Sequence, residues 1–178
     1  MNKKNKGFSL LEVMITLVII AVGMLGVAGM SLKASFLNIE NAQKNEALYL
    51  ANDIVNRMRA NSDNASDYVG TTVGANPDPD GNASIVDDDL GSWKSEVESR
   101  LVAGTGCIYE EDGKVLVAVA WQSDAPLGDA ISNIKKRYSA SSAKSMVGKA
   151  DACGNGKYNN GNKINQFRQA VVVNTYIG

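Results

Sequence analysis

Residues 7–34 read GFSLLEVMITLVIIAVGMLGVAGMSLKA, and this stretch decides the fold. It carries only two charges, Glu12 near its start and Lys33 near its end. Val13 to Leu32 are 20 successive residues without a charge. At about 1.5 Å per residue, a helix of that length spans about 30 Å, the thickness of the hydrocarbon core of a bilayer. The stretch is therefore predicted to be a membrane-spanning helix.

Three lysines and no acidic residue lie ahead of the apolar stretch, within residues 1–7. Because positive charge beside a membrane helix favours the cytoplasmic side, the chain beyond the span is predicted to lie outside the cytoplasm. An ordinary secretory signal has a shorter apolar core of about 7–15 residues, followed by a cleavage site of small residues. Here the apolar run is longer, and small residues at that spacing occur only within it.

Glu12 is a functional candidate because a carboxylate in a membrane helix costs about 2.5–3.5 kcal/mol at mid-bilayer, and less near an end. The alternative is that its side chain reaches the headgroups at the interface. The sequence around it, GFSLLEV at residues 7–13, resembles the processing site of type IV pilins and type II secretion pseudopilins.

This resemblance implies that prepilin peptidase cuts between Gly7 and Phe8 and that the new N-terminus at Phe8 is N-methylated. Residues 1–7 are then a leader, and residues 8–34 the transmembrane and assembly half of a helix. The amine of Phe8 would lie one helical turn from Glu12, so Glu12 of one subunit is predicted to pair with the amine of another. An unpaired charge in an apolar filament core is expensive, whereas a paired charge fixes the register.

Beyond the span the pattern becomes amphipathic. One continuous helix is predicted from about Phe8 to Ala60. Its second half belongs to a periplasmic domain that comprises residues 35–178 and packs against the rest of that domain. Its apolar residues recur at steps of three and four: Ala47, Leu50, Ala51, Ile54 and Met58. Three glycines in the span favour close packing of membrane helices and leave open whether the helix kinks: Gly23, Gly26 and Gly29.

Residues 61–92 are polar, with NPDPDG at 76–81 and three successive aspartates at 87–89, and are predicted to form a surface loop. Four residues match part of the spacing of a calcium-binding loop: Asp78, Asp80, Asn82 and Asp89. Because Ala83 stands where that loop needs its turn glycine, a solvated loop is preferred and no metal site is predicted.

The remaining pattern predicts a short helix at 92–101 and then an antiparallel sheet. Its expected strands are 107–109, 115–121 and 167–177. The predicted fold class is α+β and type IV pilin-like, with a long N-terminal helix on a small antiparallel sheet. Residues 122–166 are rich in Ser, Asn, Lys and Gly, with one short helix considered near 130–138.

Cys107 and Cys153 are the two cysteines of the chain. Outside the cytoplasm two cysteines in a small domain most simply pair, so a disulfide is predicted, whereas two unrelated buried thiols are the alternative in the cytosol. In the chain-entropy model, closing a loop of this size stabilises a protein by on the order of 4 kcal/mol.

Composition argues against an enzyme. The chain has no histidine, the side chain most used for acid–base chemistry near neutral pH and the commonest metal ligand. The best candidate for a nucleophile with a base is Ser139 or Ser141 with Lys144. Serine and lysine are so common in this segment that their spacing does not indicate an active site. No catalytic residue and no cofactor are therefore predicted. The near-balance of 18 basic and 19 acidic residues gives no global preference for nucleic acid.

The helix end, RMRAN at 57–61, resembles that of PilV-type minor pilins. This resemblance implies a structural subunit of a priming or tip complex that starts pilus assembly and supports twitching motility, adhesion and DNA uptake. Its partners would be the major pilin, other minor pilins, a tip adhesin, prepilin peptidase and the inner-membrane assembly platform. The chain would be a single-pass inner-membrane protein before assembly and part of a surface pilus afterwards.

Two alternatives stay open. One is a minor pseudopilin of type II secretion, which has the same architecture. The other is a tip module that binds a ligand or DNA through basic residues of the C-terminal half, namely Lys135, Lys136, Arg137, Lys144, Lys149, Lys157 and Lys163.

Overall fold

The structure is a computed structural model of the chain. It describes residues 7, 9–69, 84–111, 113–123 and 168–177, together with residues 153, 154, 157 and 158. The chain divides into two units, Met1–Asn41 and Ala42–Gly178.

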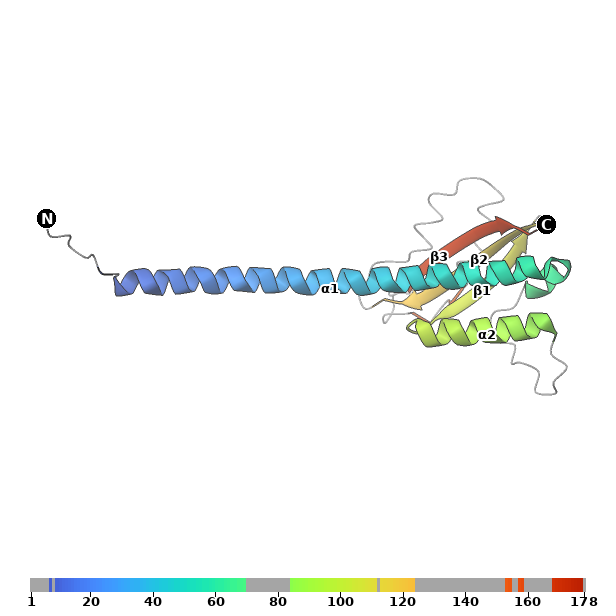
Figure 1. Cartoon of the computed structure of the whole chain (residues 1–178), viewed down its shortest axis with the longest axis horizontal. Coiled ribbons are helices and arrows are strands. Elements are labelled where there is room, and N and C mark those ends of the chain that lie inside the picture. The colour runs from blue at the N-terminus through green and yellow to red at the C-terminus, as the bar shows by residue number, and fades with distance from the viewer. Residues whose placement is uncertain are drawn as a thin grey trace. The chain divides into compact units, whose positions relative to one another are not determined.

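Helix α1 spans Leu10–Ala60, close to the predicted bounds, and continues without interruption through the three glycines of its apolar part (Figure 1). Within the second unit one face of the helix is buried, and the buried residues are those that the amphipathic pattern predicts, with one addition, Val55. They are Ala47, Leu50, Ala51, Ile54, Val55 and Met58.

The stretch predicted to be a loop at 61–92 contains two helical elements instead. A 3-10 helix, η1, spans Ser62–Tyr68, and helix α2 spans Ile85–Arg100 and so begins seven residues before the predicted start at 92. Ser84 caps α2: its side chain accepts from the amide of Asp87, whose carboxylate accepts in turn from the amide of Ser84. Acidic residues at this end of a helix also interact favourably with its dipole.

The sheet consists of β1 (Thr105–Glu111), β2 (Lys114–Gln122) and β3 (Arg168–Tyr176). The order is β1-β2-β3 and both pairings are antiparallel, with Cys107 opposite Ala118 and Ala118 opposite Val172. The three predicted strands are thus present, and the predicted α+β class, a long N-terminal helix followed by a small antiparallel sheet, is confirmed.

The two faces of β2 belong to different clusters, as the two-residue period of a strand requires. Val115, Val117, Val119 and Trp121 join the core formed with α1 and α2. On the opposite face, Leu116 and Ala118 pack with the two cysteines. The central strand is therefore apolar on both faces, as its sequence predicts.

Trp93 is the side chain that joins the two helices and the sheet. Its indole nitrogen donates a 2.8 Å hydrogen bond to the carbonyl of Leu50 in α1. Its ring lies so close to Gly106 in β1 that a Cβ atom there would be 2.4 Å from it. A larger residue at position 106 would therefore displace the ring.

Helix α2 runs antiparallel to the second half of α1. The side chain of Arg57 contacts Asp89 near the start of α2, whereas Glu46, earlier in α1, contacts Arg100 at the end of α2. The helix considered near 130–138 lies outside the described residues, as do Ser139, Ser141 and Lys144.

Candidate processing and assembly site

The N-terminal end of α1 carries the predicted processing residues. Gly7 is exposed, and Phe8 lies outside the described residues. The carbonyl of Ser9 accepts from the amides of Glu12 and Val13, at 3.0 and 3.3 Å, so the helix begins directly after Ser9. The predicted cleavage position is therefore next to the start of the helix.

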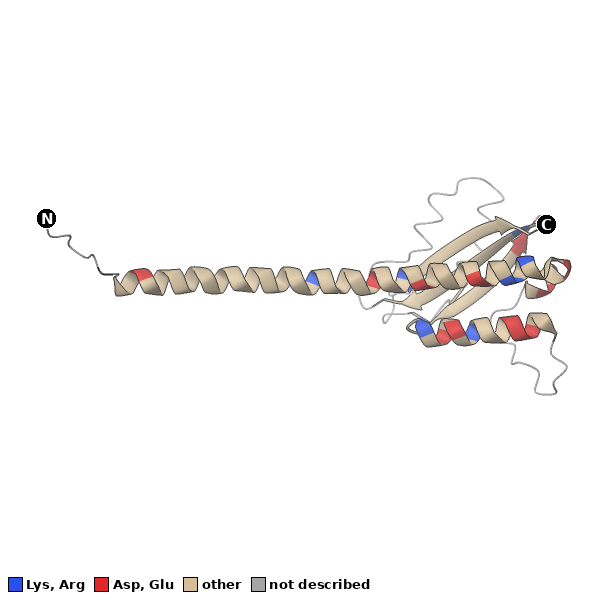
Figure 2. Ribbon diagram, in the orientation of Figure 1, with Lys and Arg blue, Asp and Glu red and all other residues tan. Residues whose placement is uncertain are grey.

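Glu12 lies in the first turn of α1, and its side chain is exposed. A carboxylate at this place interacts favourably with the positive end of the helix dipole. In α1 no further charge follows until Lys33 (Figure 2). One negative charge thus stands at the beginning of a long uncharged surface.

That surface is apolar, and the first unit buries none of it. The large hydrophobic side chains from Leu10 to Leu32 are between 47% and 82% exposed. By length and composition, α1 contains a candidate membrane span near the N-terminus. Exposure of this much contiguous apolar surface indicates that lipid or other helices cover it.

The helix-end sequence at 57–61 forms a second candidate site, at the corner of the domain. The guanidinium of Arg57 donates to Asp53 at 2.8 Å, to Asp89 at 3.3 Å and to Glu96 at 3.4 Å. Burial alone would lower the pKa of Arg57, but its hydrogen bonds and charge interactions with Asp53 and Asp89 raise it. One cation thus links α1 to two positions of α2.

The neighbours of Arg57 connect the corner to other elements. Met58 is fully buried in the core. Arg59 donates a 2.6 Å hydrogen bond to the hydroxyl of Thr175 in β3. Asn61 donates to the hydroxyl of Tyr68, which donates in turn to Asp89 at 2.6 Å. The sequence marked this segment mainly by resemblance. Apart from the bonds of Arg57 to Asp53 and of Asn61 to Tyr68, its contacts join residues far apart in the chain and could not be read from it.

The two cysteines are joined by a disulfide between β1 and the turn that contains Cys153. Both are almost fully buried on the outer face of the sheet, beside Leu116 and Ala118.

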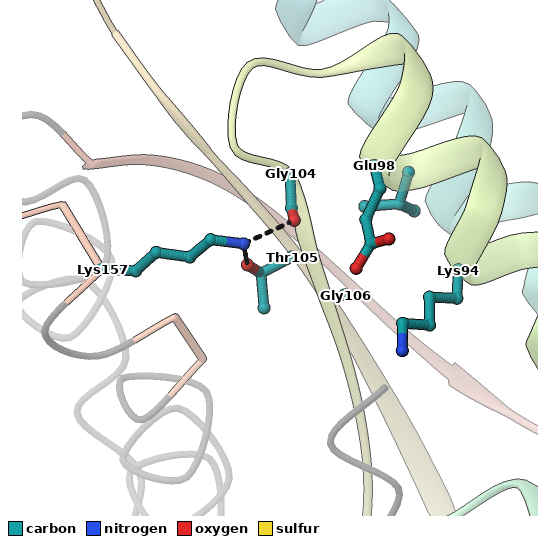
Figure 3. Close-up of a pocket in the computed structure, with 7 residues that line it drawn as sticks. Lys94, Glu98, Gly104, Thr105, Gly106 and Lys157 are labelled. Atoms are coloured by element: carbon teal, nitrogen blue, oxygen red, sulfur yellow. Dashed lines mark hydrogen bonds between the residues drawn. The ribbon is translucent and has the colours of Figure 1, made fainter. Parts of the chain in front are cut away.

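A small cavity lies between α2 and the start of β1, with a volume of about 60 Å³. Lys94, Glu98 and Lys157 line it, and the hydrogen bonds of Lys157 are directed to Gly104 and Thr105 (Figure 3). Pockets for small-molecule ligands typically measure about 300–1,000 Å³, so this one is too small for such a ligand.

The described residues contain no group of three acidic, Cys or His side chains able to hold a metal ion. Three of the residues with calcium-loop spacing lie outside this part of the chain: Asp78, Asp80 and Asn82. The fourth, Asp89, lies in α2 and is engaged by Arg57 and Tyr68.

Residues 2–28 match the family model described as the prokaryotic N-terminal methylation motif. Neither a curated protein nor a solved structure matches the chain. The matched segment contains Gly7, Glu12 and most of the apolar surface of α1, and it is followed by a small antiparallel sheet domain. This motif and this architecture support membership of the type IV pilin family, which implies association with a membrane and partners in assembly.

Proposed function

We propose that this chain is a PilV-like minor pilin of a type IV pilus. It is cut between Gly7 and Phe8, N-methylated at Phe8 and assembled with other subunits through Glu12 and the apolar half of α1. The observation that carries this proposal is the methylation motif at residues 2–28, placed directly at the start of a helix whose apolar side chains are exposed.

The proposed role is structural rather than enzymatic. Before assembly the chain crosses the inner membrane once, with its N-terminus in the cytoplasm and residues 35–178 in the periplasm, and it then enters a surface pilus. Its partners are the major pilin, other minor pilins and the inner-membrane assembly platform. As part of a priming or tip complex it supports twitching motility and adhesion, and a tip adhesin is one of its neighbours.

The same N-terminal features would serve a minor pseudopilin of type II secretion. What favours the pilus is the corner at 57–61, whose sequence resembles that of PilV-type minor pilins and in which Arg57, Met58 and Arg59 each contact the domain. Ligand or DNA binding through basic residues of the C-terminal half is the weaker alternative. Lys157, which belongs to that set and to the described part of the chain, directs its ammonium to Gly104 and Thr105 of the domain itself.

Two measurements test the proposal. Mass spectrometry of the membrane-extracted protein should find a methylated Phe8 as the first residue when prepilin peptidase is active. In a strain that lacks the peptidase, the first residue should be Met1. An intact Met1 with active peptidase would contradict processing.

Deletion of the gene for this chain should reduce the number of surface pili and the twitching motility, and it should leave type II secretion unchanged. Loss of secretion with normal pili would assign the chain to the pseudopilus instead.

A further inference from the structure

Cys153, Gly154, Lys157 and Tyr158 are the described residues of a turn that holds the second cysteine. The amide of Lys157 donates a 3.0 Å hydrogen bond to the carbonyl of Gly154. Gly154 has a φ of +67°, and a Cβ atom there would lie 2.5 Å from the ring of Tyr158. Because glycine alone fits both requirements without strain, the ring of Tyr158 can fold back over the turn.

Tyr158 fastens this turn to β1 and β2. The side chain is 1% exposed. Its hydroxyl oxygen lies 2.8 Å from the carbonyl of Ala103, 3.1 Å from the carbonyl of Ala120 and 3.1 Å from the hydroxyl of Thr105. The single hydroxyl proton can be donated to one carbonyl while the oxygen accepts from Thr105.

Lys157 adds a second attachment beside the first. Its ammonium donates to the carbonyl of Gly104 at 3.1 Å and to the hydroxyl of Thr105 at 3.0 Å (Figure 3). The hydroxyl oxygen of Thr105 therefore accepts a hydrogen bond from Lys157, and the same hydroxyl can donate a hydrogen bond to the hydroxyl oxygen of Tyr158. Both side chains of the turn converge on the first residue of β1.

Arg168 holds the other end of the turn from β3. It is fully buried, and its guanidinium donates a 3.0 Å hydrogen bond to the carbonyl of Cys153. A buried charge is costly unless it is hydrogen-bonded, so this contact constrains where the backbone of Cys153 can lie. That backbone belongs to the residue that bonds Cys107 on β1.

We propose that Lys157, Tyr158 and Arg168 form a non-covalent clasp that docks Cys153 and Gly154 on the sheet and so directs Cys153 to Cys107 before the disulfide forms. In the unfolded chain the two cysteines are 46 residues apart, and loop closure makes their encounter rare. In the folded, reduced chain the clasp supplies their proximity.

The oxidation itself is ordinary thiol–disulfide exchange with an added disulfide such as oxidised glutathione. The thiolate of one cysteine attacks glutathione disulfide, forms a mixed disulfide and releases one glutathione thiolate. The other cysteine thiolate attacks the protein sulfur of that mixed disulfide and expels the second glutathione thiolate. Two protein thiols are oxidised, one glutathione disulfide is reduced, and the thiol protons pass to solvent.

The test measures the effective concentration of the cysteine pair in the full chain in detergent, from its equilibrium in glutathione buffers after alkylation and mass analysis. Tyr158→Phe keeps the ring and removes the hydroxyl. Because a hydrogen bond contributes about 0.5–1.5 kcal/mol and 1.4 kcal/mol is a factor of ten, the effective concentration should fall about two- to tenfold. Lys157→Met should lower it as well. Lys94→Met changes a lysine of the same cavity that makes no hydrogen bond with the described residues of the turn, and it should leave the effective concentration unchanged.

Two controls separate the clasp from general stability. Ile54→Val weakens the core cluster that does not contain the two cysteines. An equal fall for Ile54→Val and Tyr158→Phe at matched global stability would overturn the proposal. In urea all variants should give the same low value. In the Cys107→Ser/Cys153→Ser variant the amide of Lys157 should remain protected from hydrogen exchange, and exchange at the rate of an unfolded chain would overturn the proposal too.

Discussion

Arg57, Met58 and Arg59 are adjacent in sequence and make three different contacts. Arg57 binds carboxylates of α1 and α2, Met58 enters the core, and Arg59 reaches β3. At the end of a helix, successive side chains point about 100° apart, so three neighbours can each contact a different element. From the sequence, Arg57 and Arg59 are equivalent, since both also suit the negative end of the helix dipole. Only the folded arrangement distinguishes them.

The first prediction concerns this difference. Arg57→Met leaves three partly buried carboxylates without their shared cation and should lower the free energy of unfolding by about 2 kcal/mol. Arg59→Met removes one exposed hydrogen bond and should cost less than about 0.5 kcal/mol. Urea unfolding of the two variants, followed by the fluorescence of Trp93 and Trp121, gives the comparison. Equal losses would refute the network as a source of stability.

Among the elements, those with a clear hydrophobic period were predictable and the first half of α2 was not. The strong apolar run of β2 and the three- and four-residue steps of α1 are local signals. In α2, Val86 and Leu90 continue the stripe of Trp93 and Val97, but three consecutive aspartates conceal it. The capping sequence, Ser84 followed by an acid three residues later, was a signal that could have located the start of the helix.

The second prediction follows from that cap. Ser84→Ala removes the acceptor for the amide of Asp87 and should lower the free energy of unfolding by about 1 kcal/mol. Ser99→Ala is the matched control, because the hydroxyl of Ser99 lies near the other end of the same helix and bonds only a local carbonyl, that of Glu96. A loss for Ser99→Ala as large as that for Ser84→Ala would show that the cap does not stabilise α2.

At the scale of the whole molecule, the two candidate sites differ in how far sequence could reveal them. The N-terminal site is linear: its residues lie within a few turns of one helix, so a short motif contains all of it. The corner and the clasp are assembled by folding. Tyr158 is hydrogen-bonded to Ala103, and Arg59 to Thr175. Both pairs are far apart in the sequence, and no local pattern predicts them. The disulfide was predictable because the chain has only two cysteines, but its supporting hydrogen bonds were not.

The third prediction is a loss of stability at alkaline pH. Burial raises the pKa of Tyr109 and of Tyr158 above the ordinary value of 10.0, although the nearby charge of Arg168 opposes this for both. The folded state therefore holds these protons more tightly than the unfolded state. Their stabilising contribution is complete below pH 10.0 and declines as the pH rises above it.

Urea unfolding between pH 9 and pH 11 (about one unit either side of the ordinary tyrosine value) should show this decline. Tyr158→Phe should make the decline less steep. Tyr176→Phe changes a residue that is 65% exposed and should leave the steepness of the decline as it is in the wild type. A decline of wild-type steepness in Tyr158→Phe would refute the assignment to Tyr158.

The last prediction concerns assembly and distinguishes pairing of Glu12 with a neighbouring amine from simple exposure at the membrane surface. Glu12→Ala should insert into the membrane as well as the wild type or slightly better, because it removes a carboxylate that costs up to about 2.5–3.5 kcal/mol in a bilayer. If Glu12 pairs with the amine of Phe8 in another subunit, the variant leaves that amine unpaired in an apolar surrounding, at a cost of about 3–5 kcal/mol. Its incorporation into sheared pili should therefore fall more than about tenfold.

Glu12→Gln is the sharper variant, because it keeps the size and the hydrogen-bonding capacity of the side chain and removes only the charge. Its incorporation into sheared pili should fall as much as that of Glu12→Ala. Lys33→Gln removes the other charge of the apolar segment and controls for a general effect of charge on insertion. The amount of this protein in membranes and in sheared pili, measured for all four strains, separates insertion from assembly. If both Glu12 variants reach wild-type amounts in the pili, the carboxylate lies at the interface and the pairing does not occur.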